Sequence, residues 1–196
     1  FTPSNLGNHT FLLKITALGN TGVSLFFVLS GFVITRILLQ SVDSSSYFRT
    51  FYLRRTLRIF PLYYFALTCY YVLPVLFLNK DAIPPFSSQL PFWVYLQNFA
   101  RTFHWDSSGP GHFWSLAVEE HFYLLWPGIV YLFFKKNKHS LFIFSIGLYF
   151  FTLFVRFFML KEGYEINVFT FTRIDQLVLG CLLALLERNG YLTSQY

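Results

Sequence analysis

Charged residues are scarce in this chain. Only 12% of its 196 residues are Asp, Glu, Lys or Arg, whereas 55% are hydrophobic and 22% are aromatic. A soluble domain carries about twice that share of charge. Twenty-seven Phe and thirteen Tyr cannot all be hidden in one core of this size, so we expect the excess apolar surface to face lipid. The composition therefore excludes an ordinary soluble domain.

Cysteine is scarce as well. Cys69 and Cys181 each lie inside an apolar run, which fits neither a disulfide framework nor a metal site. We expect packed or lipid-facing thiols and no metal. The chain begins at Phe1 without Met and shows no signal peptide, so we expect it to be a piece of a longer protein.

Long uncharged runs are what the chain has instead. Twenty-one uncharged residues lie between Lys14 and Arg36, and twenty-one more between Arg58 and Lys80. A membrane-spanning helix needs about 20. Three further apolar runs are long enough, or nearly so, to serve as spans: 107–134, 140–155 and 174–186.

The segment 82–100 is uncharged too, but three prolines interrupt it. We expect a loop there with one short, half-buried helix at 92–99. The sequence thus predicts an all-α fold, a polytopic transmembrane helical bundle of about five spans that forms a single domain over residues 1–196.

Basic residues are concentrated in alternate connections. The segment 36–58 holds five arginines and 135–139 holds three lysines, whereas the other connections hold only Lys80, Arg101 and Lys161. Connections rich in Lys and Arg stay in the cytoplasm. This pattern predicts a multi-pass protein of the inner (plasma) membrane. The net charge of +6 does not indicate a nucleic-acid partner, because the basic residues sit at the ends of apolar runs.

One cluster of arginines lies in "FYLRRTLRIFPLYY", residues 51–64. Arg55 and Arg58 share a face of a helix, with Arg54 beside them, and Pro61 suits the first turn of the following span. Two interpretations are open. The arginines either set topology alone or form a clamp that grips phosphates in paired geometry.

Acidic residues stand inside the apolar segment "GHFWSLAVEEHFYLLWP", residues 111–127. Ser115, Glu119 and Tyr123 are four apart and line one helical face, and Glu120 is adjacent. A charge deep in a bilayer costs roughly 3 kcal/mol, so two acidic residues indicate a function there. The structural alternative is an ion pair between this acidic pair and an arginine of another helix, Arg156 or Arg173.

The histidines carry less information. We expect His112 and His121 to be interfacial or hydrogen-bonded rather than catalytic, and His9 and His104 to lie in loops.

Five segments together resemble the acyltransferase-3 family, multi-pass membrane proteins that O-acylate sugars of the bacterial envelope. In the order and spacing of that family, they are "GVSLFFVLSGFVIT" (22–35), "FYLRRTLRIFPLYY" (51–64), "LQNF" (96–99), "FWSLAVEEHFYLLWP" (113–127) and "RIDQLVLGCLLA" (173–184). In the first segment, small Ser30 and Gly31 permit close approach of another helix.

The resemblance implies roles for particular residues. Arg55 and Arg58, with Arg54 beside them, match the arginines thought to meet the phosphates of acyl-CoA, so acetyl-CoA or another acyl-CoA is the implied donor. Glu119 and Glu120 match the acidic motif.

Further matches complete this motif and add the segment before the last span. Trp114, Ser115 and Tyr123 accompany the acidic pair, and we expect Glu119, Glu120, Ser115 and Tyr123 to be the catalytic set. Arg173 and Asp175 match a pair that we expect to be a structural polar pair. The family's catalytic histidine is expected in a span before Phe1, and His9 does not match it.

The resemblance therefore implies an integral membrane acyltransferase. It would move an acyl group, expected to be acetyl, from acyl-CoA to a hydroxyl of an envelope sugar or polysaccharide, either directly or through an acyl-enzyme. Its partners would be the lipid bilayer, acyl-CoA and a glycan acceptor. The alternative is a transporter or flippase in which the carboxylate pair relays protons or binds substrate.

Overall fold

The computed structural model describes residues 4–77 and 83–190, and every regular element in these ranges is a helix. The long helices are α1 (Ser4–Ser41), α2 (Tyr47–Phe77), α5 (Trp114–Lys136), α6 (Lys138–Lys161) and α7 (Thr170–Arg188). Short α3 (Phe86–Trp93), α4 (Gln97–Thr102) and the 3-10 turn η2 (Gly111–Phe113) lie between α2 and α5. The predicted all-α class is confirmed.

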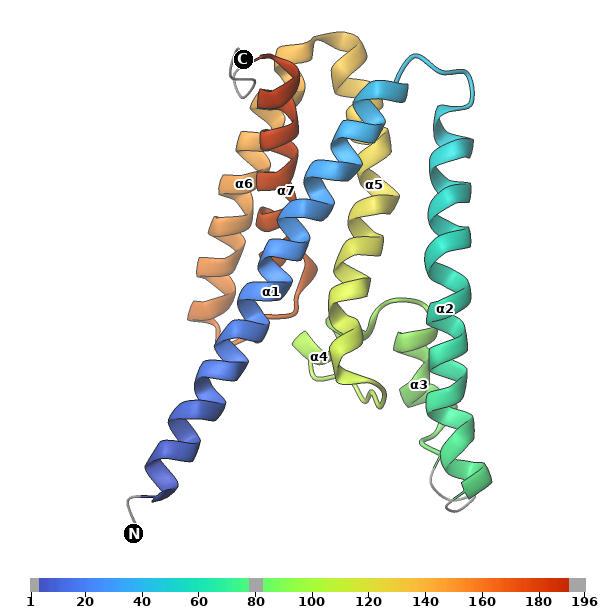
Figure 1. The fold of residues 1–196 in the computed structure, drawn as a ribbon, viewed down its shortest axis with the longest axis vertical. Coiled ribbons are helices and arrows are strands. Elements are labelled where there is room, and N and C mark those ends of the chain that lie inside the picture. The colour runs from blue at the N-terminus through green and yellow to red at the C-terminus, as the bar shows by residue number, and fades with distance from the viewer. Residues whose placement is uncertain (1–3, 78–82, 191–196) are drawn as a thin grey trace.

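The long helices alternate in direction. The α1–α2 and α5–α6 connections lie at one end of the molecule, and α3, α4 and the α6–α7 connection lie at the other (Figure 1). The arginines on either side of the α1–α2 connection and the lysines at the α5–α6 connection therefore lie at the same end, as their alternation along the sequence predicts.

Two helices are long and apolar enough to cross a membrane. They are Thr21–Ser41, the later part of α1, and His139–Lys161, nearly all of α6. Few residues of α6 are buried, and its exposed side chains include Phe150, Phe154 and Phe157. In the described ranges α2, α5 and α7 do not meet the same criterion, and each of them carries charged residues. The bundle of five spans remains a prediction, with which two apolar helices agree.

Several predicted boundaries were wrong. Helix α2 begins at Tyr47, so Arg55 and Arg58 lie on a helix as their spacing predicts, but the connection ends before Tyr47 and not at Arg58. The helix continues through Pro61, because losing one backbone N–H donor in a long helix is tolerated when the neighbouring turns stay bonded. The backbone of His9 belongs to α1, not to a loop, and Lys80 lies outside the described residues.

The predicted single helix at 92–99 is in fact two helices. Helix α3 ends at Trp93 and α4 starts at Gln97, and Tyr95 between them has a positive φ of 59°. Because a residue in this left-handed backbone conformation cannot continue a right-handed helix, Tyr95 separates α3 from α4. The break lets the chain turn back across the end of α5.

Helices α1 and α7 pack backbone against backbone. A Cβ atom on Gly31 would overlap the main chain at Leu177, and one on Gly180 would overlap the main chain at Val28 and Phe32. The buried Cys181 thiol beside Gly180 donates to the Gly31 carbonyl oxygen at 3.7 Å. The predicted close approach at Gly31 is confirmed, and Cys181 is a packed thiol. Cys69 is half-buried and free.

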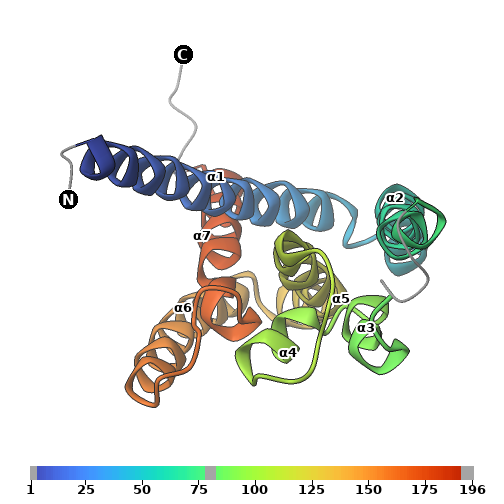
Figure 2. The same ribbon diagram turned by 90° about the horizontal axis from the view of Figure 1, so that it is seen from below.

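Helix α2 contacts the other helices at its start and at its middle. Near its start, the Tyr47 and Tyr52 hydroxyls donate to the carbonyl oxygens of Pro127 and Leu124 on α5, at 3.1 and 2.8 Å. At its middle, Tyr63 packs with α3 in a second apolar cluster. Viewed along the bundle, α2 stands at one end of α1, away from α6 and α7 (Figure 2). Space opens beside α1 and α5 between these two contacts.

Candidate functional site

A cavity of about 360 Å³ lies between the later part of α1 and the first halves of α2 and α5. Its polar walls come from all three helices. Ser30 lies on α1, and the other polar lining residues are Arg55 and Arg58 of α2 and Glu119 and Tyr123 of α5. We call it the α1–α2–α5 pocket.

Glu119 is the buried acid of this pocket. Its side chain is 4% exposed, and its Oε1 has no hydrogen-bond partner. The hydroxyls of Ser30 and Tyr123 are hydrogen-bonded to each other, and both lie within hydrogen-bonding reach of the Glu119 carboxylate. A buried polar oxygen without a partner is rare in proteins, so the free Oε1 indicates a place for a ligand or water.

Ser115, the third residue of the predicted face, does not line the pocket. Its hydroxyl donates to the His112 carbonyl oxygen at 3.3 Å, one turn earlier. The helical face therefore brings Glu119 and Tyr123 together, and the hydroxyl that joins them comes from Ser30 of α1.

Arg55 is the basic residue that interacts electrostatically with the acidic pair. Its guanidinium lies 5.0 Å from the centre of the Tyr123 ring and acts electrostatically on both Glu119 and Glu120. Arg55 is half-buried, whereas Arg54 and Arg58 are exposed. A buried carboxylate is tolerated when a cation stands close, and Arg55 supplies that cation here.

A second cavity, of about 250 Å³, lies at the α1–α2 connection and is called the α1–α2 pocket. Three arginines and four hydroxyl side chains belong to its lining: Arg54, Arg55, Arg58, Ser41, Ser44, Ser46 and Thr50. Arg55 and Arg58 line both cavities, so they join the basic end of the molecule to the acid Glu119. Guanidinium groups with hydroxyls around them suit a phosphate-bearing ligand.

Glu120 faces a different set of neighbours. It is half-buried, its Oε1 has no partner, and it does not line the α1–α2–α5 pocket. Its carboxylate interacts electrostatically with the phenol groups of Tyr64 and Tyr95. Burial is the largest cause that raises the pKa of the Tyr95 phenol, and the nearby Glu120 carboxylate raises this pKa further.

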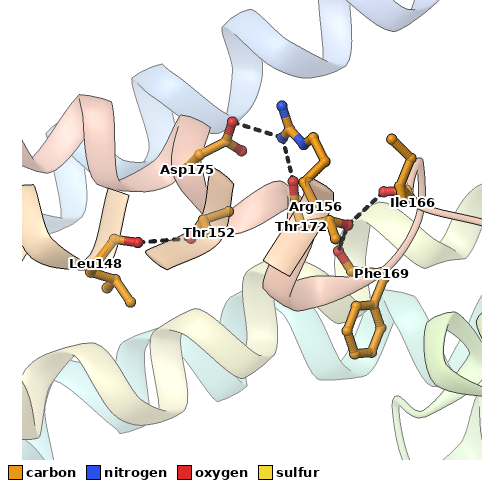
Figure 3. A network of polar contacts seen from close by, with 7 residues as sticks. All are labelled: Leu148, Thr152, Arg156, Ile166, Phe169, Thr172 and Asp175. Carbon is orange, nitrogen blue, oxygen red and sulfur yellow. Dashed lines mark hydrogen bonds and ion pairs between the residues drawn. The ribbon is translucent and has the colours of Figure 1, made fainter. Parts of the chain in front are cut away.

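The polar pair expected between Arg173 and Asp175 was assigned to the wrong arginine. Asp175 forms its ion pair with Arg156 of α6 at 2.7 Å, and Arg156 also donates to the Thr172 carbonyl oxygen (Figure 3). Arg173 instead lies over the Trp114 ring, 5.4 Å from its centre. Residues two apart on a helix point to different sides, which is why the neighbours in sequence do not pair.

The same contacts concern the two arginines considered as partners of Glu119. Arg156 pairs with Asp175 and Arg173 lies over Trp114, so the arginine that acts on Glu119 is Arg55 of α2. Asp175 and Arg156 tie α7 to α6, and the Thr172 hydroxyl closes the α6–α7 connection on the Ile166 and Phe169 carbonyl oxygens (Figure 3).

Among the side chains that the structure describes, His104, His112, His121 and His139 do not line either cavity. His121 shares a hydrogen bond of 2.8 Å with the Thr170 hydroxyl of α7, as expected for a hydrogen-bonded histidine. His112 is exposed, and His104 lies in the turn after α4. Among the residues that the structure describes, no three His, Cys, Asp or Glu side chains gather as a metal site would require.

Sequence reasoning missed Ser30 as the partner of Tyr123 and the hydroxyls of the α1–α2 pocket. The run "SVDSSS" (41–46) just before the arginines was the available signal for the latter, because hydroxyls and arginines together are typical of phosphate sites. No periodicity predicts the Ser30 contact, which depends on how α1 crosses α5.

Comparison with known proteins places this chain in a family. The acyltransferase domain of the acyltransferase-3 family matches residues 1–193, and the chain belongs to that family. It is 37% identical over 145 residues to the peptidoglycan O-acetyltransferase OatA of Listeria monocytogenes, covering 66% of this chain and 23% of that protein. It is 31% identical over 188 residues to the O-acetyltransferase OatA of Staphylococcus aureus, covering 85% of this chain and 30% of that protein. The chain thus spans less than a third of the length of these relatives, and no solved structure matches it.

Proposed function

We propose that this member of the acyltransferase-3 family forms the membrane part of an O-acetyltransferase. It would take an acetyl group from acetyl-CoA, or another acyl-CoA, and deliver it to a hydroxyl of a cell-wall sugar. The observation that carries the proposal is the sharing of Arg55 and Arg58 by two cavities, one of them basic and the other containing Glu119.

The donor would enter from the basic end. Arg54, Arg55 and Arg58, with the hydroxyls of the α1–α2 pocket, supply charged and neutral donors for the phosphates of coenzyme A. Because Arg55 and Arg58 also line the α1–α2–α5 pocket, a donor whose phosphates they bind could extend its thioester toward Glu119.

The transfer itself joins the acceptor oxygen to the thioester carbonyl carbon and breaks the carbon–sulfur bond. The proton of the hydroxyl leaves with a base and ends on the thiol of coenzyme A. We expect the base to be a histidine of the family's first span, as the resemblance implies. Glu119 would orient that imidazole or stabilise it when charged, with Ser30 and Tyr123 holding the carboxylate in place.

The orientation follows from the same arrangement. We propose a multi-pass protein of the inner membrane with the α1–α2 and α5–α6 connections in the cytoplasm, where acyl-CoA is made. The acceptor would then approach from the end that carries α3 and α4 (Figure 1). Membership of an acyltransferase family favours this function over a transporter that uses the carboxylates as a proton relay.

The test is transfer of label by the full-length protein in inside-out membrane vesicles. Acetyl-CoA labelled in its acetyl group is added outside, and acetylated glycan is counted inside. We expect label in the glycan for the native protein and loss of at least nine-tenths of it for Arg55→Ala. Vesicles that acetylate glycan from another acetyl donor, but take nothing from acetyl-CoA, would refute the donor.

A further inference from the structure

The segment "LQNF" (96–99) contains two buried amides to which the proposed mechanism gives no task. Asn98 is fully buried, and its Nδ2 donates to the Thr170 hydroxyl, which fastens α4 to α7. Gln97 is 3% exposed, and its Nε2 donates to the Phe113 carbonyl oxygen at 2.8 Å. The Oε1 of Gln97 has no partner, although an oxygen so deeply buried normally has one.

Gln97 lines a cavity of about 190 Å³ near the α3–α4 end of the bundle, opposite the α1–α2 connection (Figure 1). We call it the outer pocket. Two aromatic rings and three polar side chains line it beside Gly111: Trp114, Phe92, Gln97, Arg101 and Ser107. A small cavity with aromatic walls and a few convergent polar groups is the usual form of a binding site for one small ring.

The charge of the outer pocket is already balanced. Arg101 donates from Nε and Nη2 to the two carboxylate oxygens of Glu165, at 3.0 and 2.7 Å. A guanidinium held in this paired way is a poor site for an additional anion. Gln97 offers an uncharged acceptor, and Ser107 offers a hydroxyl. The pocket therefore suits a neutral ligand with hydroxyl or amide hydrogens and an apolar face for Trp114 and Phe92.

We infer that the outer pocket binds a sugar ring of the glycan acceptor, with Gln97 Oε1 accepting a hydrogen bond from a sugar hydroxyl or N-acetyl amide. This inference rests on the proposed function, which supplies the glycan.

A path of contacts leads from the outer pocket toward the acidic pair. Gln97 Nε2 lies 3.4 Å from the Tyr63 hydroxyl, and the Tyr63 ring stacks on Tyr95 with 4.1 Å between ring centres. Tyr95 in turn feels the charge of Glu120. The outer pocket is thus linked through Tyr63 and Tyr95 to Glu120, on the side away from the donor arginines.

Gly111→Leu fills the outer pocket without disturbing the packing. A Cβ atom there meets nothing within 4 Å, and the backbone of Gly111 needs no left-handed conformation. Gly147→Leu is the matched control. A Cβ on Gly147 likewise meets nothing within 4 Å, but Gly147 lies on α6 away from the outer pocket.

Gln97→Met removes the unpartnered oxygen at nearly constant size. Its matched control is Gln89→Met. Gln89 is also buried, but both ends of its amide are used, by the Pro84 carbonyl oxygen at 2.7 Å and by Trp93 Nε1 at 3.5 Å. Loss of a buried amide hydrogen bond to the fold is therefore common to both variants, and only Gln97→Met changes the outer pocket.

The probe is chitotetraose, four linked N-acetylglucosamine units, titrated calorimetrically into the full-length protein in detergent. We expect its dissociation constant to rise about tenfold or more in Gly111→Leu and about fivefold in Gln97→Met, the effect of one lost hydrogen bond. Both control variants should bind it as the native protein does. In the transfer assay, the acceptor constant should rise while the constant for acetyl-CoA stays unchanged.

The outcomes separate the inference from the proposed function. Native transfer and native chitotetraose binding in both Gly111→Leu and Gln97→Met would overturn the inference and leave the proposed function standing. Weakened chitotetraose binding in these variants, in a protein that transfers nothing from acetyl-CoA, would overturn the proposed function instead. Binding of a short serine-containing peptide in the outer pocket, with no response to chitotetraose, would also overturn the inference.

Discussion

Glu119→Gln keeps the shape of a buried side chain and removes its charge. Glu119 is 4% exposed and lies beside the hydroxyls of Ser30 and Tyr123, so the amide can still take part in hydrogen bonds there. What it loses is the negative charge that would hold or stabilise a charged imidazole. Positioned acid–base groups contribute about 10²–10⁴ in rate, so turnover should fall by a factor of about 100 or more. That fall corresponds to about 2.7 kcal/mol of barrier.

Two other acids serve as comparisons for this variant. Glu120→Gln should lower turnover less, because Glu120 points away from the α1–α2–α5 pocket toward Tyr64 and Tyr95. Glu187→Gln should leave turnover unchanged, since Glu187 forms only a partly exposed ion pair with Arg36, at 3.6 Å.

The assay is single-turnover transfer of labelled acetyl groups by the full-length variants, normalised to the amount of inserted protein. The constant for acetyl-CoA should stay within about twofold of the native value in Glu119→Gln, because the phosphates would bind to the arginines. Full turnover in Glu119→Gln, with Glu120→Gln equally active, would refute the role given to this carboxylate.

Three further expectations concern the arginines, the topology and the α6–α7 contact. Arg55→Ala should raise the apparent constant for acetyl-CoA about tenfold or more, with partial rescue by lysine, whereas Arg49→Ala, outside both cavities on the same helix, should not change it. A cysteine placed at exposed Ser45 should resist an impermeant thiol reagent added to intact cells, and labelling from outside would reverse the orientation. Asp175→Ala leaves the Arg156 guanidinium without its ion-pair partner and should lower the free energy of unfolding by about 1–3 kcal/mol. The measurement is thermal stability in detergent, and unchanged stability would show that the pair contributes nothing.

The long helices could be predicted because their apolar runs end at charges, but their limits could not. The connection was predicted to extend to Arg58 because basic residues gather in cytoplasmic connections, although Arg55 and Arg58 were also expected to share a helical face. Arginine is a good helix former with a long stem that can carry its charge to the surface, so α2 includes it. A hydropathy profile accounts for the charge of a residue but not for the length of the side chain that carries the charge.

The candidate site could be predicted in its residue types but not in its pairs. Helical spacing brought Glu119 and Tyr123 to one face, which the structure shares. The partners from other helices, Ser30 for Tyr123 and Arg156 for Asp175, depend on crossing angles and on rotation about each helix axis. Spacing within one helix contains no information on either quantity.

The contact of Gly31 with the α7 backbone has a consequence for the effect of substitutions at this crossing of α1 and α7. At this point α1 and α7 touch through main-chain atoms, which have no rotamers and cannot rearrange around an added methyl group. Ser30 directly precedes Gly31 in the chain, so the distance between the α1 and α7 axes also sets where the Ser30 hydroxyl meets Tyr123. Random mutagenesis scored for loss of acetylation should therefore recover substitutions at Gly180 in protein that still inserts. Loss of activity at Gly180 would then reflect helix packing, because this residue contacts the α1 backbone and lines neither the α1–α2 pocket nor the α1–α2–α5 pocket.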